Sequence, residues 1–187
     1  MSIRLFNPSG GFIDLNAGGD GTAANTFTLP AETGTVLTTG STFAGTGPAF
    51  SAYKSVAQSI STATTTKATF PSEEYDTASC YDASTSTFTP NVAGYYQFIF
   101  CGQNDTVTSG RCQTWLYKNG AAAFFKEENL NGPGSTYPSR LLSCLVYANG
   151  TTDYFEIYVR QESGTNKELY GGGTNNTVFQ GYLVRAA

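Results

Sequence analysis

The sequence predicts an all-β protein whose larger part is a sandwich or jelly roll. Strand-like runs recur about every eight to fifteen residues between turn signals, as in β-sandwiches. Several of these runs alternate apolar and polar residues, and no stretch keeps a helical period. Phe, Tyr and Trp make up 14% of the 187 residues, which is enough for a sizeable core. The elements are therefore expected to be short strands joined by turns.

The run GYYQFIF shows the alternation most clearly. Tyr96, Phe98 and Phe100 are expected to point to one side of a strand, because successive side chains of a strand face opposite ways. In DYFEIYVR, Phe155 and Ile157 alternate with polar or tyrosine neighbours in the same manner. Other strands are expected in AFSAYKSVA, TKATF, STFTP, RCQTWLYKNG, AAAFFKE, SRLLSCLVY and TVFQGYLVR.

Two short segments predict tight turns between strands. Lys118-Asn119-Gly120 is a strong signal, because Asn and Gly accept the positive φ that a two-residue hairpin turn requires. Ala148-Asn149-Gly150 has the same character. Residues 118–120 are therefore expected to join two antiparallel strands.

Residues 1–47 differ from the remainder. Short apolar pieces (SIRLF, FIDL, TFTLP, GTVLTT) alternate with Gly-rich turns, and STFAGTGPAF has the composition of a linker. Strands this short cannot bury a core alone, so we expect them to be ordered only against copies of themselves or another protein. The segment TFTLPAETGTVLTTG resembles one found near the N-termini of fibre and appendage proteins of tailed bacteriophages. The predicted division is an attachment arm, 1–47, and a knob, 48–187.

A more specific pattern begins at Phe70. Its spacing is F-x5-D-x4-Y-x6-F-x5-G-x-Y-x-F-x-F, formed by Phe70, Asp76, Tyr81, Phe88, Gly94, Tyr96, Phe98 and Phe100. This pattern resembles that of the globular-head domain of complement C1q and its tumour-necrosis-factor-like relatives. PAFSA at 48–52, LYKNG at 116–120 and FQGYL at 179–183 also resemble segments of that family. The aromatic side chains of the pattern are expected in the core, and Gly94 where a side chain would not fit.

The resemblance implies a quaternary structure. Domains of this family form tight trimers around a threefold axis, with the first and last strands together at one end. It therefore implies a homotrimeric C1q/TNF-like jelly roll from which three arms leave side by side. The arms would mount the trimer on other virion proteins of a capsid or tail.

Charge and hydropathy exclude several classes of partner. The formal net charge is −4 and the ten Lys and Arg residues are scattered, so we expect no nucleic-acid binding. No apolar run reaches the roughly 18 residues of a membrane helix, so no membrane partner is expected. The opening MSIRLFNPSGGF lacks the apolar stretch of a secretory signal. We therefore expect synthesis in the cytoplasm of a bacterial host and a final location on the virion surface.

The chain contains no histidine, and this argues against an enzyme. The adjacent carboxylates Glu73-Glu74 and Glu127-Glu128 are interpreted as solvated turns, since neighbours on a strand face opposite ways and make no acid–base couple. Gly171-Gly172-Gly173 lacks the Lys and the helix of a phosphate-binding loop. No catalytic residue is predicted.

No cofactor or metal site is predicted either. Some relatives hold calcium near the trimer axis, and here residue type alone offers Asp76, Asp82, Asp105 and Asp153. The four cysteines are Cys80, Cys101, Cys112 and Cys144, and no pair has CxxC spacing. They are interpreted as buried reduced thiols, although Cys101 and Cys112 flank a plausible hairpin and would then face each other.

Exposed loop residues supply candidates for sugar binding by stacking and hydrogen bonding: Tyr137, Tyr170 and Asn175. The functional hypotheses are a capsid decoration or cement protein and a short tail fibre, weighted evenly. No coiled-coil or collagen-like shaft is present, which favours a short mount. The alternatives are a host-receptor or glycan-binding adhesin at the tail and a soluble lectin-like C1q module.

Overall fold

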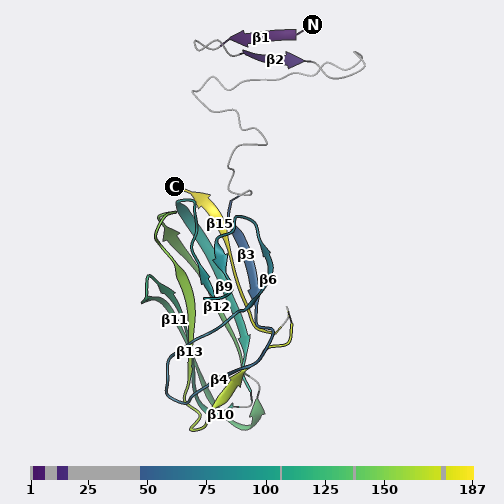
Figure 1. Cartoon of the computed structure of the whole chain (residues 1–187). Helices are drawn as coiled ribbons and strands as arrows, with labels where there is room; N and C mark the ends of the chain where they lie inside the picture. Colours follow the sequence, from purple (N-terminus) through teal and green to yellow (C-terminus); the bar gives the residue numbers. More distant parts are fainter. Residues whose placement is uncertain (1, 7–11, 17–46, 106, 137, 174–175) are drawn as a thin grey trace. The chain divides into compact units, whose positions relative to one another are not determined.

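The computed structural model describes residues 2–6, 12–16, 47–105, 107–136, 138–173 and 176–187 (Figure 1). The chain divides into two compact units, Met1–Thr39 and Gly40–Ala187. In the described residues every regular element is a strand, and no helix occurs that could cross a membrane.

The described residues of the first unit form a β-hairpin. Strands β1 (Ser2–Phe6) and β2 (Phe12–Asn16) pair antiparallel, with Ser2 opposite Asn16 and Phe6 opposite Phe12. The strands predicted in SIRLF and FIDL are thus confirmed. Those predicted in TFTLP and GTVLTT lie outside the described residues. The boundary predicted between residues 47 and 48 stays a prediction.

The second unit is built from two antiparallel sheets. The first, named here the β9 sheet, has the order β12 (Ser139–Ala148), β9 (Gly94–Gln103), β15 (Val178–Ala186), β3 (Ala49–Tyr53), β6 (Ser72–Asp76). The second, the β10 sheet, has the order β11 (Ala121–Thr136), β10 (Val107–Lys118), β13 (Phe155–Gln161), β8 (Thr87–Phe88), β7 (Tyr81–Asp82), and β5 (Thr66–Lys67) also pairs with β13. A small sheet joins β14 (Lys167–Leu169) to β4 (Gln58–Ile60). The predicted all-β jelly-roll class is confirmed.

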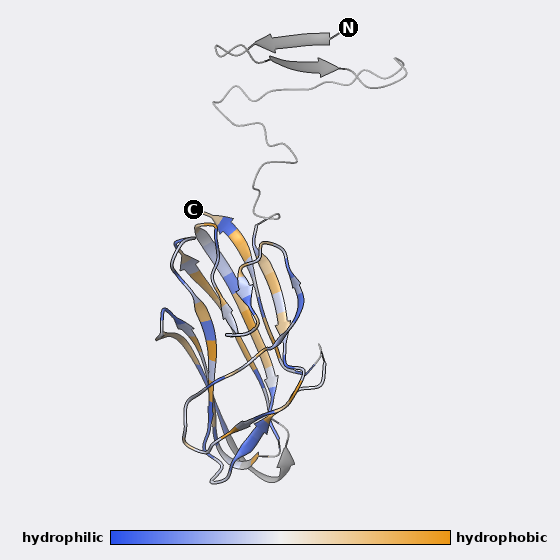
Figure 2. Cartoon of the chain, in the orientation of Figure 1, coloured by the Kyte–Doolittle hydropathy of each residue, from blue (hydrophilic) through white to orange (hydrophobic). Residues whose placement is uncertain are grey.

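Aromatic side chains fill the space between the two sheets. Tyr96, Phe98 and Phe100 are fully buried, as the alternation of GYYQFIF predicts. Phe98 of the β9 sheet contacts Phe155 of the β10 sheet at 4.5 Å between ring centroids. Figure 2 shows hydrophobic and hydrophilic residues alternating along the strands, which is the pattern of sheets with one face inward.

The other residues of the Phe70 pattern meet at this core. Phe70, Tyr81 and Phe88 are buried, and the Tyr81 hydroxyl donates to the Phe70 carbonyl at 3.0 Å. The Asp76 carboxylate accepts hydrogen bonds from the amides of Ala78 and Tyr81, which fixes the turn between β6 and β7. This role explains why a short acidic side chain stands in the pattern.

Gly94 lies where strand β15 passes close to β9. A Cβ at Gly94 would lie 2.4 Å from the carbonyl oxygen of Arg185 and 2.7 Å from a methyl carbon of Leu183. A side chain is therefore excluded by space, and this position needs glycine for close approach of two backbones.

The two predicted turns have different outcomes. Asn119 and Gly120 have φ values of 54° and 77°, so the predicted tight turn between β10 and β11 is confirmed. At Asn149 the connection between β12 and β13 is longer than a tight turn. It crosses between the sheets, and the Asn149 side-chain oxygen accepts from the amides of residues 151–153.

Two sequence interpretations are wrong. Cys101 and Cys112 do not face each other across a hairpin, because β9 and β10 belong to different sheets, and all four cysteines are free. Glu73-Glu74 and Glu127-Glu128 lie in strands β6 and β11 instead of turns. Each of these strands ends its sheet, where charged side chains remain in solvent.

The two ends of the knob lie together. Strand β3 pairs antiparallel with β15, and Ala49 lies opposite Tyr182. The chain therefore enters and leaves the sandwich at the same end, as the family resemblance implies (Figure 1).

Candidate interaction surfaces

The outward side of the β9 sheet carries an apolar surface, named here the apolar face. Its positions alternate with the buried ones: Tyr95 and Ile99 on β9 stand opposite Tyr147 and Ser143 on β12. Large side chains on this face are well exposed, and they are Tyr95, Leu141, Leu145, Tyr147 and Tyr182. Exposed apolar patches of this kind mark protein–protein contacts.

The apolar face lacks charge over its centre. The outward positions of β9 from Tyr95 to Cys101, and their partners on β12, contain no Lys, Arg, Asp or Glu. Tyr182 and Gln180 of β15 continue the same uncharged surface, opposite Gln97 and Ile99. A face that is apolar and uncharged resembles the central part of a subunit interface.

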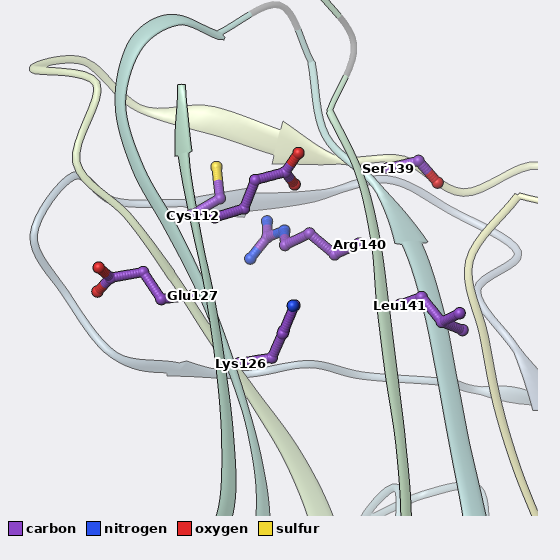
Figure 3. A pocket seen from close by; sticks show the side chains of 7 residues that line it. Cys112, Lys126, Glu127, Ser139, Arg140 and Leu141 are labelled. Atoms are coloured by element: carbon purple, nitrogen blue, oxygen red, sulfur yellow. The ribbon is translucent and has the colours of Figure 1, made fainter. Parts of the chain in front are cut away.

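A groove opens beside this face, between the edge strands of the two sheets. We name it the β11–β12 groove. One end is lined by apolar side chains that include Phe124, Leu142 and Cys144. The other end is a cavity of about 380 Å³ lined by Cys112, Lys126, Glu127, Glu128, Ser139, Arg140 and Leu141 (Figure 3).

Arg140 is the central polar residue of the cavity. Its side chain is 3% exposed and extends from β12 toward Cys112 and Lys126 on the opposite sheet (Figure 3). Nη1 donates to the Gln113 carbonyl oxygen at 2.9 Å, and Nη2 donates to Oδ1 of Asn104. Arg140 therefore ties the β9 sheet to the β10 sheet.

The charge of Arg140 is incompletely balanced. Burial lowers the pKa of its guanidinium, and the neighbouring Cys112 and Glu128 act in the opposite direction. No carboxylate of the described residues forms an ion pair with Arg140, and its Nε and Nδ2 of Asn104 have no hydrogen-bond partner among the described residues. The cavity is thus polar, and the hydrogen bonds of Arg140 within it connect the two sheets.

The thiols show no sign of activation. Burial raises the pKa of the Cys112 thiol, and it raises the pKa of Cys144 to about 11. Burial also raises the pKa of Cys80. Nucleophilic cysteines need lowered values, so these three behave as small core residues.

No group of three potential metal-ligating side chains occurs in the described part of the chain. The four aspartates considered for calcium are engaged separately. Asp82 accepts from Ser84 and Thr85, and Asp153 forms an ion pair with Lys118 at 2.8 Å. Asp76 caps its turn, and Asp105 accepts from the Tyr170 hydroxyl at 3.2 Å.

The residues predicted to bind sugars are only partly described. Tyr137 and Asn175 lie outside the described residues. Tyr170 is half-buried, with its hydroxyl bonded to Asp105. Their joint role stays a prediction.

The Gly-rich loop packs closely against another segment. A Cβ at Gly171 would lie 2.4 Å from the backbone of Val56, and the amide of Gly172 donates to the Lys54 carbonyl at 3.0 Å. Close backbone packing therefore accounts for Gly171.

Sequence reasoning did not identify the apolar face or Arg140. The signal for the face was present in SRLLSCLVY, where Leu141 and Leu145 alternate with Leu142 and Cys144, so that both sides of the strand are apolar. Arg140 has no such signal, because a single arginine in a strand is usually exposed.

The comparisons with known proteins identify a family and similar structures for the knob. A model of the C1q domain matches residues 49–184. The globular domain of zebrafish complement 1qA protein is 19% identical, with 75% of this chain and 99% of that chain covered and a TM-score of 0.46. Murine APRIL is 9% identical, with 72% and 97% covered and a TM-score of 0.55. The PRD1 vertex protein P5 is 14% identical, with 75% and 99% covered and a TM-score of 0.53.

The search of curated proteins finds no match to the chain. APRIL and P5 share the fold. The C1q match covers well over half of the residues, including the whole Phe70 pattern, and it confirms the resemblance of the knob. The chain belongs to the C1q domain family.

Proposed function

We propose that this protein is a non-enzymatic structural component of a tailed bacteriophage virion, where a homotrimeric knob is mounted through residues 1–47. The exposed apolar face is the observation on which the proposed self-association is based. The fold of the PRD1 vertex protein P5 and the fibre-like sequence of the arm support the virion location. The mount is a capsid decoration or a short tail fibre.

Two surfaces supply the contact between subunits. The apolar face lies on the β9 sheet, and the β11–β12 groove lies at the open edge of the sandwich. A contact that joins two different surfaces is heterologous and closes into a ring when the rotation permits. Packing the edge of one subunit against the apolar face of the next would bury both surfaces in a trimer.

Leu145→Glu tests this assembly. Leu145 is 49% exposed in the monomer, so the variant is expected to fold. A carboxylate at the centre of an apolar contact costs several kcal/mol because it loses its hydration. Light scattering after size exclusion should show a trimer for the wild type and a monomer for the variant.

Val56→Glu is the matched control. Val56 is 71% exposed and lies outside the apolar face, so the same chemical change there should leave the trimer intact. A wild type that is monomeric at high concentration would contradict the assembly. So would dissociation by both variants alike.

The mounting is tested separately. Deletion of residues 1–45 should leave a folded trimeric knob that no longer attaches to particles. Normal decoration by the truncated knob would refute the role of the arm. Imaging of virions with the protein labelled then decides between the mounts, because hundreds of copies indicate the shell and a few dozen or fewer indicate the tail.

The alternative is a binding function, as a host-receptor or glycan-binding adhesin at the tail or as a soluble lectin-like C1q module. The aromatic side chains on the outward side of the β10 sheet support glycan binding. Absence of the protein from purified virions would favour the soluble module.

A further inference from the structure

The outward side of the β10 sheet carries a row of aromatic rings, named here the aromatic row. Trp115 of β10 is in register with Phe125 of β11 on one side and with Tyr158 of β13 on the other. The Trp115 and Phe125 ring centroids lie 5.2 Å apart. Tyr117 stacks on Tyr158 at 4.1 Å, so two pairs of rings lie on neighbouring positions of three strands.

These rings are not part of the core. Thr114 and Leu116, which alternate with Trp115 and Tyr117 on β10, are the residues that are buried. Phe125 is 53% exposed, and the other three rings are half-buried. The row thus presents aromatic surface to solvent on a sheet whose inner face already has its own packing partners.

Polar groups flank the row on the same face. Gln113 donates from Nε2 to Glu127 at 2.6 Å, and its Oε1 has no hydrogen-bond partner among the described residues. Burial raises the pKa of the Tyr158 hydroxyl, and Glu156 beside it acts in the same direction. The row is therefore bordered by amide, carboxylate and hydroxyl groups.

The charges on this face balance one another. Lys67 pairs with Glu156 at 2.6 Å, and Arg160 pairs with Glu162 at 2.7 Å. Arg111 pairs with Glu162 at 2.6 Å and lies 3.7 Å from Glu127. Three cations thus meet three anions, and these ion pairs leave no unbalanced charge among themselves beside the row.

We infer that the aromatic row is a binding site for a neutral glycan. Sugar rings present flat C–H surfaces that pack on aromatic rings, and their hydroxyls match the bordering donors and acceptors. Nucleic acid would require excess positive charge, which the paired residues do not supply. A protein partner would have to desolvate these ion pairs, which is costly. A neutral polysaccharide requires neither excess positive charge nor desolvation of the ion pairs.

The row is separate from the apolar face, and Phe125 is the one of its four rings that also lines the β11–β12 groove. The row lies on the β10 sheet, whereas the apolar face lies on the β9 sheet. Trp115, Tyr117 and Tyr158 do not line the groove, so a trimer held by these two surfaces would leave their rings accessible. The inference deepens the adhesin alternative and rests on that proposal for its biological meaning, and its test includes light scattering so that glycan binding and assembly are read separately.

The experiment uses Trp115, the single tryptophan of the chain, as reporter. The full-length protein is titrated with a panel of neutral oligosaccharides of hexoses and N-acetylhexosamines, and the tryptophan emission is recorded. We expect a saturable change with at least one of them. Alginate, which is anionic, should give no change.

Phe125→Ala tests the site. Its exposed ring can be removed without opening the core, and the affinity should fall at least tenfold as the stacking surface is lost. Tyr75→Ala removes an aromatic ring of similar exposure, 47%, from the β9 sheet and should leave the affinity unchanged.

Three results would overturn the site: no response to any neutral oligosaccharide, a response to alginate alone, or an affinity that Phe125→Ala does not reduce. Light scattering on the same samples shows whether the trimer is present. Failure of glycan binding is therefore distinguished from failure of the assembly.

Discussion

The two outward faces of the knob use large residues in different ways. On the β9 sheet, Leu141 and Leu145 stand among uncharged neighbours. On the β10 sheet, Trp115 and Tyr158 stand among ion pairs such as Lys67–Glu156. An uncharged apolar face loses little by being desolvated, whereas a face with ion pairs keeps its water. The first face therefore suits a subunit contact, and the second suits a hydrated ligand.

The same strand geometry produces both faces. Every second side chain is assigned to the shared core, so the outward positions are free to differ between the sheets. Phe98 and Phe155, from opposite sheets, meet inside at 4.5 Å between ring centroids. The core therefore sets the fold, and the outward residues set what the two faces can bind.

The largest expected effect comes from the core beneath both faces. Phe98→Ala removes a fully buried ring that contacts Phe88, Phe155 and Phe179. The loss of apolar burial and the cavity left behind should lower the free energy of unfolding by about 3–5 kcal/mol. Urea denaturation at one fixed protein concentration measures this. A Phe98→Ala variant of unchanged stability that lost only assembly or only glycan binding would contradict the role of the core in supporting both faces.

Much of this architecture could be predicted from the sequence. The alternation of Tyr96, Phe98 and Phe100 predicted the inward side of β9, and Asn119-Gly120 predicted the β10–β11 turn. In both cases a local rule decides the structure: the two-residue period of a strand, and the positive φ of the turn.

The rest depended on contacts between distant segments. Glu73 and Glu74 are in an edge strand, whose exposed charged residues give no alternation. The crossing from β9 to β10 changes sheets, which no local signal marks. Trp115 and Tyr117 alternate just as core residues do, so the sequence alone could not assign them to the outward side.

Lys54 is a buried cation that directly follows strand β3 of the β9 sheet. It is 1% exposed, and Nζ donates to Gln58 at 2.9 Å and to Thr69 at 3.0 Å. Burial lowers its pKa from 10.5 to about 8. Between these two pH values the unfolded chain binds more protons than the folded chain, so stability should rise with pH, by at most about 3 kcal/mol.

Below pH 8 the cost of burying the charged amine is fully present. Urea midpoints of the wild type and Lys54→Met, measured from pH 7 to pH 10.5, test this. The rise should be smaller in Lys54→Met, while Lys167→Met should retain it. Identical profiles for the wild type and Lys54→Met would show that Lys54 is not the source.

The smallest effect concerns the β10–β11 turn, which carries the strands of the aromatic row. Gly120 has a φ of 77°, and an added Cβ would lie 3.3 Å from the Tyr154 hydroxyl. Gly120→Ala should therefore cost about 1 kcal/mol through backbone strain, and slightly more if Tyr154 cannot shift. Urea denaturation gives the loss of stability. Light scattering should still show the assembly of the apolar face unchanged.

Gly164→Ala separates strain from crowding. Gly164 has a similar φ of 85°, but an added Cβ would meet no atom within 4 Å. Its loss of stability should therefore represent backbone strain alone, and the excess at Gly120 would be the contact with Tyr154. An equal loss at both positions would mean that Tyr154 moves aside at no cost. A larger loss at Gly164 would contradict the assignment, because no contact there could explain it.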